Sequence, residues 1–254
     1  MDFPQAEVAA SRLEVLGESA STNAALRVLS NDAEAWPHLS VLITDNQTAG
    51  RGRLDRSWVA PAGTALAISV LIREMPSQPE AIGWIPLVAG LAMADAVTVQ
   101  LADHEVAVKW PNDVLVDGRK ICGILAESTG SAVVLGAGVN TVMSAGQLPV
   151  ATATSFAALG AMCDEDRLVS DYLRRLEGLL SALAVWGDGD RSGVHEAVSA
   201  RCATLGREVD VALPDGASLH GTAVRLASDG RLCVDSDGEQ TLISAGDVVH
   251  ARLV

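Results

Sequence analysis

The sequence predicts an α+β fold, in which a sheet flanked by helices is joined to a small C-terminal β-barrel. Hydrophobic residues make up 49% of the 254 residues, enough to bury a substantial core. Before residue 204, strand patterns are interrupted by two helical segments, 84–100 and 164–186. Beyond that point, short strands are separated by turns that contain Asp-Gly. The expected domains are therefore residues 1–203 and 204–254.

The first elements along the chain are strands around one short helix. Three segments have strand character, at 13–18, 41–47 and 64–72. The segment 23–30 is expected to be a short helix, with Ser21 or Thr22 placed to cap it. The glycine- and arginine-rich segment 48–58 is expected to be a loop.

The middle of the chain is predicted to add a buried helix and a hairpin. Segment 84–100 is apolar enough for a largely buried helix, and Pro86 is tolerated in its first turn. Two further strands are expected, at 105–110 and 131–140. Between them, Asp117-Gly118 suits the left-handed positions of a β-hairpin turn.

The last helix and the barrel follow. Segment 164–186 is predicted to pack on the sheet through one apolar face. That face consists of Leu168, Tyr172, Leu176, Leu179 and Leu183. The runs GREVDVALP, SLHGTAVRLAS, RLCVDSD and QTLISAGDVVHARL are then read as the strands of the barrel.

Composition excludes several classes of function. A net charge of −14 argues against a protein that coats nucleic acid, although a local basic pocket can still bind one small anion. The four cysteines form no CxxC pair and the five histidines no metal pattern. No signal peptide is visible, and the longest uncharged apolar stretch, 81–94, is shorter than a spanning helix. We expect a reduced, cytoplasmic protein without membrane or nucleic-acid partners.

Lysine usage singles out one segment. Lys109 and Lys120 are the only lysines, and both lie in KWPNDVLVDGRKICGIL, whereas 16 arginines carry the remaining positive charge. An ammonium is a compact point charge, and a guanidinium is a wide planar fork. Either this segment needs an ammonium, or the two lysines are chance survivors of a coding bias on a solvated hairpin.

The segment GRGRLDR, residues 50–56, combines three arginines with two glycines. Glycines let the backbone approach a ligand, and arginines offer bidentate donors to phosphate or carboxylate. Anion binding is favoured over a solvated loop whose arginines pair with surface acids. No GK[ST] follows, so this is not a Walker A loop.

Other signals are weak alone. Trp58 is either a core aromatic or a stacking surface for a purine. Ser21, Thr22 and Asn23 are read as capping residues or as polar contacts to a ligand, and Asn140 as a turn residue or a ligand contact.

Taken in order, these motifs resemble those of the biotin protein ligases. The order is STN, QTAGRGR, KWPND, GRKxxGILxE and GxGxN, over roughly residues 15–160. The resemblance implies a catalytic biotin- and ATP-binding domain at 1–203, with a mixed or antiparallel sheet related to class II aminoacyl-tRNA synthetases, and an SH3-like barrel at 204–254. It implies that biotin and ATP give biotinyl-5'-AMP. The biotinyl group then passes to a lysine of a biotin carboxyl carrier domain of acyl-CoA or pyruvate carboxylases.

The resemblance also implies roles for individual residues. Catalytic roles are expected for Lys120, Arg51, Arg53 and Asp113. Biotin binding is expected at Ser21, Thr22, Asn23, Gln47, Gly50, Arg51, Gly52, Arg53, Lys120 and Gly123. ATP binding is expected at Arg51, Arg53, Trp58, Lys109, Asn112, Lys120 and Asn140. Mg²⁺ should accompany ATP, although no protein motif supplies its ligands.

One residue departs from the family pattern G-R-G-R-x-G-R, because Asp55 replaces its third glycine. Aspartate tolerates the left-handed region and can pair with Arg53 or Arg56, so we expect activity to survive. We expect the arginine loop to be disordered in the empty enzyme and to close when an anion binds.

Three alternatives remain open. A lipoate or other acyl-adenylate ligase can use the related fold, and a non-catalytic biotin sensor can regulate transcription. The short segment before the first strand leaves no room for a DNA-binding winged helix, which disfavours the sensor. A phosphate-binding structural protein is disfavoured by the ordered motifs.

Overall fold

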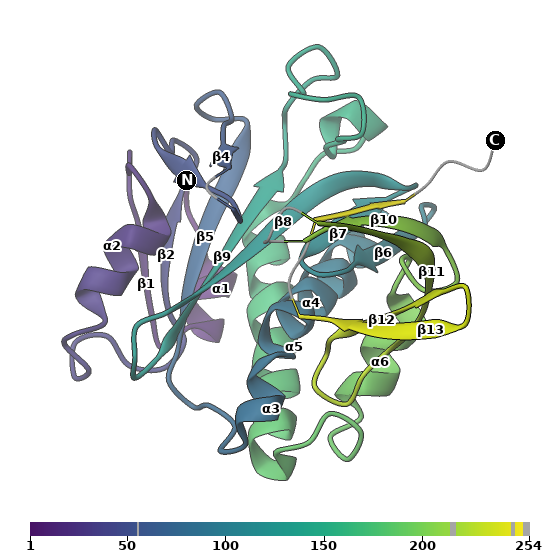
Figure 1. The fold of residues 1–254 in the computed structure, drawn as a ribbon. Coiled ribbons are helices and arrows are strands. Elements are labelled where there is room, and N and C mark those ends of the chain that lie inside the picture. Colours follow the sequence, from purple (N-terminus) through teal and green to yellow (C-terminus); the bar gives the residue numbers. More distant parts are fainter. Residues whose placement is uncertain (55, 214–216, 245–246, 251–254) are drawn as a thin grey trace.

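A seven-stranded sheet forms the larger part of the computed structural model, which describes residues 1–54, 56–213, 217–244 and 247–250 (Figure 1). The strand order is β1-β2-β5-β9-β8-β7-β6. The strands are β1 (Arg12–Val15), β2 (Ser40–Thr44), β5 (Ala65–Ile72), β6 (Val106–Lys109), β7 (Asp113–Val116), β8 (Arg119–Ser128) and β9 (Val133–Asn140). β1 runs parallel to β2, and the other neighbours are antiparallel, so the predicted mixed sheet is confirmed.

Helices cover the two faces of this sheet unequally. They are α1 (Pro4–Ala9), α2 (Thr22–Leu29), α3 (Pro79–Ile82), α4 (Ile85–Gln100), α5 (Glu165–Trp186) and α6 (Val194–Arg201), with a 3-10 turn at Ala157–Leu159. Figure 1 shows α4 and α5 side by side behind the sheet, whereas α2 contacts β2, β5 and β9. Strand residues alternate accordingly, because Val41 and Val70 join the core around α4 and α5 while Leu42 and Leu71 pack with α2.

The long helices follow the sequence expectations. Pro86 lies in the first turn of α4, and all five residues of the predicted α5 face are buried. The stretch Pro79–Gln100 is long and apolar enough to cross a membrane, but 67% of its apolar window is buried inside the protein, as in a core helix. Helices α1 and α3 were not predicted, because four to six residues are too few to show a helical period.

Two hairpins show where local sequence does and does not predict local structure. Asp117 and Gly118 both have positive φ, 49° and 74°, which confirms the predicted β7–β8 hairpin turn. The segment expected to be a loop at 48–58 instead contains a small hairpin, β3 (Gly50–Arg51) with β4 (Ser57–Trp58). Two-residue strands are too short to leave a pattern in the sequence.

The C-terminal strands form a second, antiparallel sheet. They are β10 (Glu208–Ala212), β11 (Ser218–Leu226), β12 (Leu232–Ser236), β13 (Glu239–Ile243) and β14 (Asp247–His250), in the order β13-β12-β11-β10-β14. Among the described residues, the edge strands β13 and β14 do not pair, so the sheet is open where a barrel would close.

Candidate active site

A cavity of about 160 Å³ opens on the α2 face of the central sheet. Its floor is recessed because neighbouring strands present glycine or alanine on this face, namely Ala67, Gly123, Gly136 and Gly138. A Cβ at Gly138 would lie 2.5 Å from the Trp58 ring, and a Cβ at Gly136 would lie 2.5 Å from Asn23 Oδ1. The small residues therefore make room for side chains that reach in from loops.

The end of the cavity near α2 is polar. Ser21 caps the helix by accepting a hydrogen bond from Ala24 N, as predicted, and its hydroxyl proton remains available. The backbone N–H and the hydroxyl of Thr22 both donate to Gln47 Oε1, at 3.0 and 3.2 Å. Among the described residues, Gln47 Nε2 has no hydrogen-bond acceptor, so the amide can donate to a ligand.

Asn23 is held from several sides. Its Nδ2 donates to Glu127 Oε2 at 2.8 Å and to Leu125 O at 3.3 Å. Its Oδ1 lies 2.6 Å from the hydroxyl of Ser69, which is also 2.8 Å from Thr22 Oγ1. Ser69 is fully buried, so it acts as a hidden link between the two residues. Sequence reasoning missed Ser69, which stands in no motif, and assigned no role to Glu127, although Glu127 is the last residue of the motif GRKxxGILxE.

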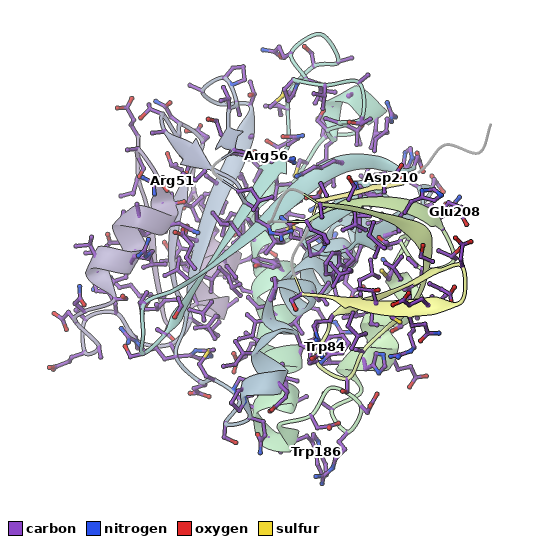
Figure 2. The ribbon with its side chains drawn as sticks, viewed as in Figure 1. Arg51, Arg56, Trp84, Trp186, Glu208 and Asp210 are labelled. Carbon is purple, nitrogen blue, oxygen red and sulfur yellow. The ribbon has the colours of Figure 1, made fainter. Side chains whose placement is uncertain are left out.

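The arginine hairpin covers another side of the cavity. Gly50 pairs with Trp58, and a Cβ at position 50 would meet Gln47 Nε2 and Trp58 O at about 2.5 Å or less. Arg53 donates to Asn112 Oδ1 at 3.2 Å. Figure 2 shows Arg51 and Arg56 on this hairpin, far from the acids Glu208 and Asp210 of the small domain. The predictions made for Asp55 lie outside the described residues.

Arg51 helps to distinguish anion binding from the alternative, in which the arginines of residues 50–56 pair with surface acids. Its side chain is exposed, and within the described parts of the chain it makes no hydrogen bond or ion pair. A guanidinium in this position keeps its donors for a ligand, which is what the anion-binding interpretation requires.

Lys120 lies in the same cavity as the hairpin and the α2 end. Its Nζ is 2.6 Å from Asp113 Oδ1 and 5.7 Å from the centre of the Trp58 ring. A bulge in the β7–β8 ladder brings these residues to one face of the sheet. A Cβ at Gly123 would lie 3.0 Å from Lys120 Nζ, so this glycine gives room to the ammonium.

The structure brings most, but not all, of the predicted site residues together. The cavity is lined by Ser21, Thr22, Asn23, Gln47, Arg51, Gly52, Arg53, Trp58, Asn112, Asp113, Lys120 and Gly123. Gly50, Lys109 and Asn140 do not line it. Asn140 is buried and donates to Thr154 O at 2.9 Å, so its amide already has a structural partner. The glycines at 136 and 138 were missed, although their alternation on one strand was a usable signal.

Cys122 lies behind the cavity, on the helix side of β8. Burial raises the pKa of its thiol far above the ordinary value. A thiol that stays protonated is a poor nucleophile, so the site offers charges and hydrogen bonds but no activated cysteine.

One group elsewhere has the composition of a metal site. His38, Glu74 and Glu177 place their ligand atoms within 4.8 Å of one another. However, His38 Nδ1 accepts a hydrogen bond from Arg73 N at 3.0 Å, so the proton lies on Nε2, which faces Glu177 Oε2 at 2.9 Å. If Nε2 of His38 were bound to a metal, Nδ1 would carry the proton and donate a hydrogen bond, whereas here Nδ1 accepts one. We therefore read this group as a hydrogen-bond network.

A mixed sheet whose polar cavity is lined by three arginines beside one ammonium is suited to a small acid and a phosphate together, as in the acyl-adenylate-forming ligases. Residues 17–140 match the Biotin/lipoate A/B protein ligase family, and residues 204–251 match the Biotin protein ligase C terminal domain. The chain belongs to the biotin protein ligase family. The resemblance inferred from the ordered motifs is thereby confirmed.

Individual relatives agree with this assignment. The chain is 39% identical to the biotin–[acetyl-CoA-carboxylase] ligase of Mycobacterium tuberculosis, over 95% of this chain and 90% of that protein. It is 32% identical to the ligase of the same name from Paracoccus denitrificans, over 92% and 98%. The biotin protein ligase from Aquifex aeolicus, solved with biotin and ATP, shares the fold, with a TM-score of 0.77, 24% identity and coverage of 96% and 100%.

Proposed function

We propose that this protein is an ATP-dependent biotin–[biotin carboxyl carrier protein] ligase that forms biotinyl-5'-AMP and transfers the biotinyl group to a carrier lysine. The observation that carries the proposal is the shared cavity, in which the polar end at Ser21 and Gln47, the arginine hairpin and Lys120 face one space. Membership of the family and the names of the relatives support the choice of biotin over other acids.

The polar end suits the ureido ring of biotin. A ureido group has N–H donors and a carbonyl acceptor, which hydroxyls and amides can satisfy together. Gln47 Nε2 and the Ser21 hydroxyl are available as donors, and Gln47 Oε1 is an acceptor already oriented by Thr22. Asn23 acts by fixing Thr22 and Ser69, because its own polar atoms are occupied.

Adenylation brings two anions together at the other end. An oxygen of the biotin carboxylate attacks the α-phosphorus of ATP, the bond from that phosphorus to the β-bridging oxygen breaks, and pyrophosphate leaves. Two unit charges 4 Å apart repel by about 4 kcal/mol at a partly screened site. Lys120 offsets this repulsion as a slim point charge, and Asp113, 2.6 Å away, orients the ammonium. Arg51 and Arg53 bind the phosphates.

Transfer completes the reaction. The neutral amine of the carrier lysine attacks the carbonyl carbon of the adenylate, AMP leaves, and the nitrogen loses a proton. The name of the Mycobacterium relative supports a carrier that belongs to an acetyl-CoA carboxylase. A pyruvate carboxylase carrier is a further expectation. All four cysteines are unpaired thiols, which supports a cytoplasmic location.

The nucleotide and its metal are assigned from fewer observations. Trp58 lies over the sheet glycines beside Lys120, and Asn112 is hydrogen-bonded to Arg53, so both are placed to contact ATP. Lys109 and Asn140 would act from outside the cavity lining. Asp113 is the one carboxylate in the described lining, which fits Mg²⁺ held mainly by ATP phosphates. Bound Mg²⁺ would neutralise phosphate charge.

The decisive experiment incubates the protein with biotin, MgATP and a biotin carboxyl carrier domain, and measures the intact mass of the carrier. The expected result is a gain of one biotinyl group. The matched reaction replaces biotin with lipoate, and a second control omits ATP. A gain with lipoate but not with biotin would transfer the proposal to the related lipoate ligases, and biotin binding without AMP formation would make the protein a sensor.

A further inference from the structure

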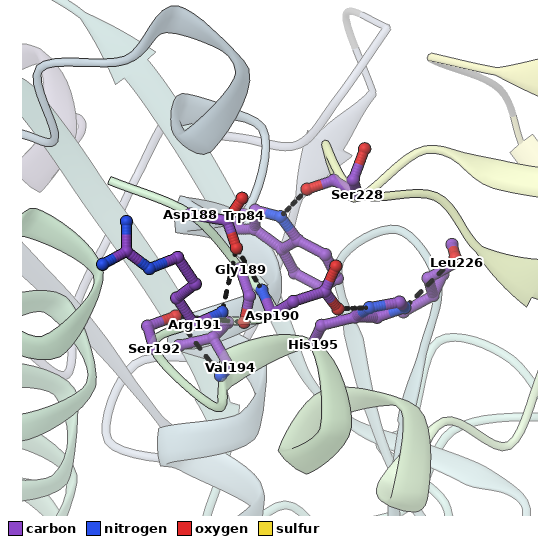
Figure 3. A network of polar contacts seen from close by, with 10 residues as sticks. All are labelled: Trp84, Asp188, Gly189, Asp190, Arg191, Ser192, Val194, His195, Leu226 and Ser228. Carbon is purple, nitrogen blue, oxygen red and sulfur yellow. Dashed lines mark hydrogen bonds and ion pairs between the residues drawn. The ribbon is translucent and has the colours of Figure 1, made fainter. Parts of the chain in front are cut away.

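A turn of the small domain, together with the last residue of the strand before it, is fastened to the catalytic domain by three side chains. The turn, residues 227–230, joins β11 to β12. Trp84 Nε1 donates to Ser228 O at 2.7 Å, and Trp110 Nε1 donates to Gly230 O at 3.0 Å. His195 Nε2 lies 3.1 Å from Leu226 O, and its ring packs against Trp84 (Figure 3).

The fit of this turn is close enough to fix its position. Trp84 and Trp110 are 0% and 2% exposed, so each buried indole N–H depends on its carbonyl partner. A Cβ at Gly83 would lie 2.3 Å from Asp229 O. Gly230 has a φ of 82°, a conformation that glycine adopts without strain.

One of the two tryptophans, Trp110, is connected through the chain to a residue of the active site. Trp110 is followed in the chain by Pro111 and Asn112. Asn112 is tied to β8 by two bonds, from its Nδ2 to Ile124 O at 2.7 Å and from Ile124 N to its carbonyl at 2.8 Å. Its Oδ1 accepts the hydrogen bond from Arg53. A continuous path thus runs from Gly230 O through Trp110 and Asn112 to the arginine hairpin.

A second cavity lies along the same path. It has a volume of about 420 Å³, and its lining includes Trp110, Asp229, Gly230 and Arg231. Arg53 and Asn112 line both cavities. The turn therefore forms one wall of the second cavity. That cavity adjoins Arg53 and Asn112, at the end of the active site where we place the ATP phosphates, which we call the phosphate end.

We propose that turn 227–230 positions the phosphate end of the active site, and that Trp110 is the positioning residue that transmits its placement to Asn112 and Arg53. This inference rests on the proposed ligase function. Trp84 supplies an internal comparison, because it makes the same kind of bond to the same turn but precedes α4 in the chain, whereas Trp110 precedes Pro111 and Asn112.

The test compares Trp110→Phe with Trp84→Phe, each of which removes one indole N–H and keeps an aromatic ring. Adenylate formation is measured at varied ATP and varied biotin, with thermal unfolding as a check on folding. For Trp110→Phe we expect kcat/KM for ATP to fall by about tenfold to a hundredfold, as for a displaced catalytic group, with KM for biotin unchanged. For Trp84→Phe we expect kcat/KM for ATP within about twofold of wild type.

Two further variants keep the proposal falsifiable. Gly83→Ala pushes on Asp229 O without touching Trp110 and should also lower kcat/KM for ATP selectively. Combining Trp110→Phe with Asn112→Ala should be no worse than Asn112→Ala alone, since the two act in series. Equal losses in both tryptophan variants, an unaffected Trp110→Phe, or additive losses in the double variant would overturn the inference. Failure of the wild-type protein to form an adenylate would instead overturn the proposed function.

Discussion

The two faces of the central sheet are built from the same strands, but one packs in the main hydrophobic core and the other lines the candidate active site. Toward α4 and α5, β5 presents Leu66 and Val70, which are fully buried in the main core. Toward the cavity, the same strand presents Ala67 and Ser69, which leave space or hydrogen-bond to site residues. Because side chains alternate along a strand, adjacent positions can serve stability and recognition separately. Mutations on the two faces should therefore separate folding from activity.

The largest effect is expected on the cavity face, at Lys120. Lys120→Ala should slow adenylate formation by about 10²- to 10³-fold, the usual cost of losing one electrostatic stabiliser. Lys120→Arg should be nearly as slow, because a wide guanidinium does not fit between Asp113, 2.6 Å away, and the Trp58 ring. Pyrophosphate release with biotin and MgATP measures the rate.

Arg119→Ala is the matched control for Lys120, because it removes a neighbouring positive charge that is exposed. It should keep near wild-type activity. A near wild-type rate for Lys120→Arg would remove the role assigned to the slim ammonium.

The opposite face is tested at Leu66, three residues from Ser69 on the same strand. Leu66→Ala should lower the free energy of unfolding by about 2–5 kcal/mol, because it leaves a cavity in a fully buried cluster. The activity of each folded molecule should be unchanged. Urea unfolding followed by an adenylation assay on the folded protein measures both. Loss of activity without loss of stability would contradict the separation of the two faces.

Local sequence could predict the parts of this arrangement that local physics determines. The β7–β8 turn followed from Asp117-Gly118, and the α5 face followed from its period. The contributions of Ser69 and Glu127 could not be predicted, because they meet Asn23 only after distant segments pair. The contact of Trp110 with Gly230 joins residues 120 positions apart and left no local signal.

Ser69 offers a finer test of the cavity face. Ser69→Ala removes a hydroxyl that lies 2.6 Å from Asn23 Oδ1 and 2.8 Å from Thr22 Oγ1. A hydrogen bond of this kind contributes about 0.5–1.5 kcal/mol, so biotin should bind up to about tenfold more weakly. Ser40→Ala is the control, because Ser40 is equally buried but bonds to Pro37 O outside the cavity. Titration calorimetry with biotin should separate the two, and equal affinities would remove Ser69 from the recognition network.

The smallest effect is expected at the tip of the β7–β8 hairpin, which belongs to neither face. A hydrogen bond from His104, 2.7 Å away, lowers the pKa of Asp117 below its ordinary value of 3.8, and the N–H of Glu105 also donates to it. Since the folded protein binds this proton less readily than the unfolded chain, the stabilisation is present above pH 3.8 and is lost as the pH falls through the lower folded value.

The Asp117 side chain is 42% exposed, so solvent screening keeps this contribution to stability small. Asp117→Asn preserves the left-handed turn. Its urea midpoint should be slightly lower than wild type at neutral pH, and this difference should disappear at a pH below the folded pKa of Asp117. Biotin affinity should not change at either pH, because Asp113 and Gly123 pair at the other end of the hairpin; a change would show that the tip communicates with the cavity.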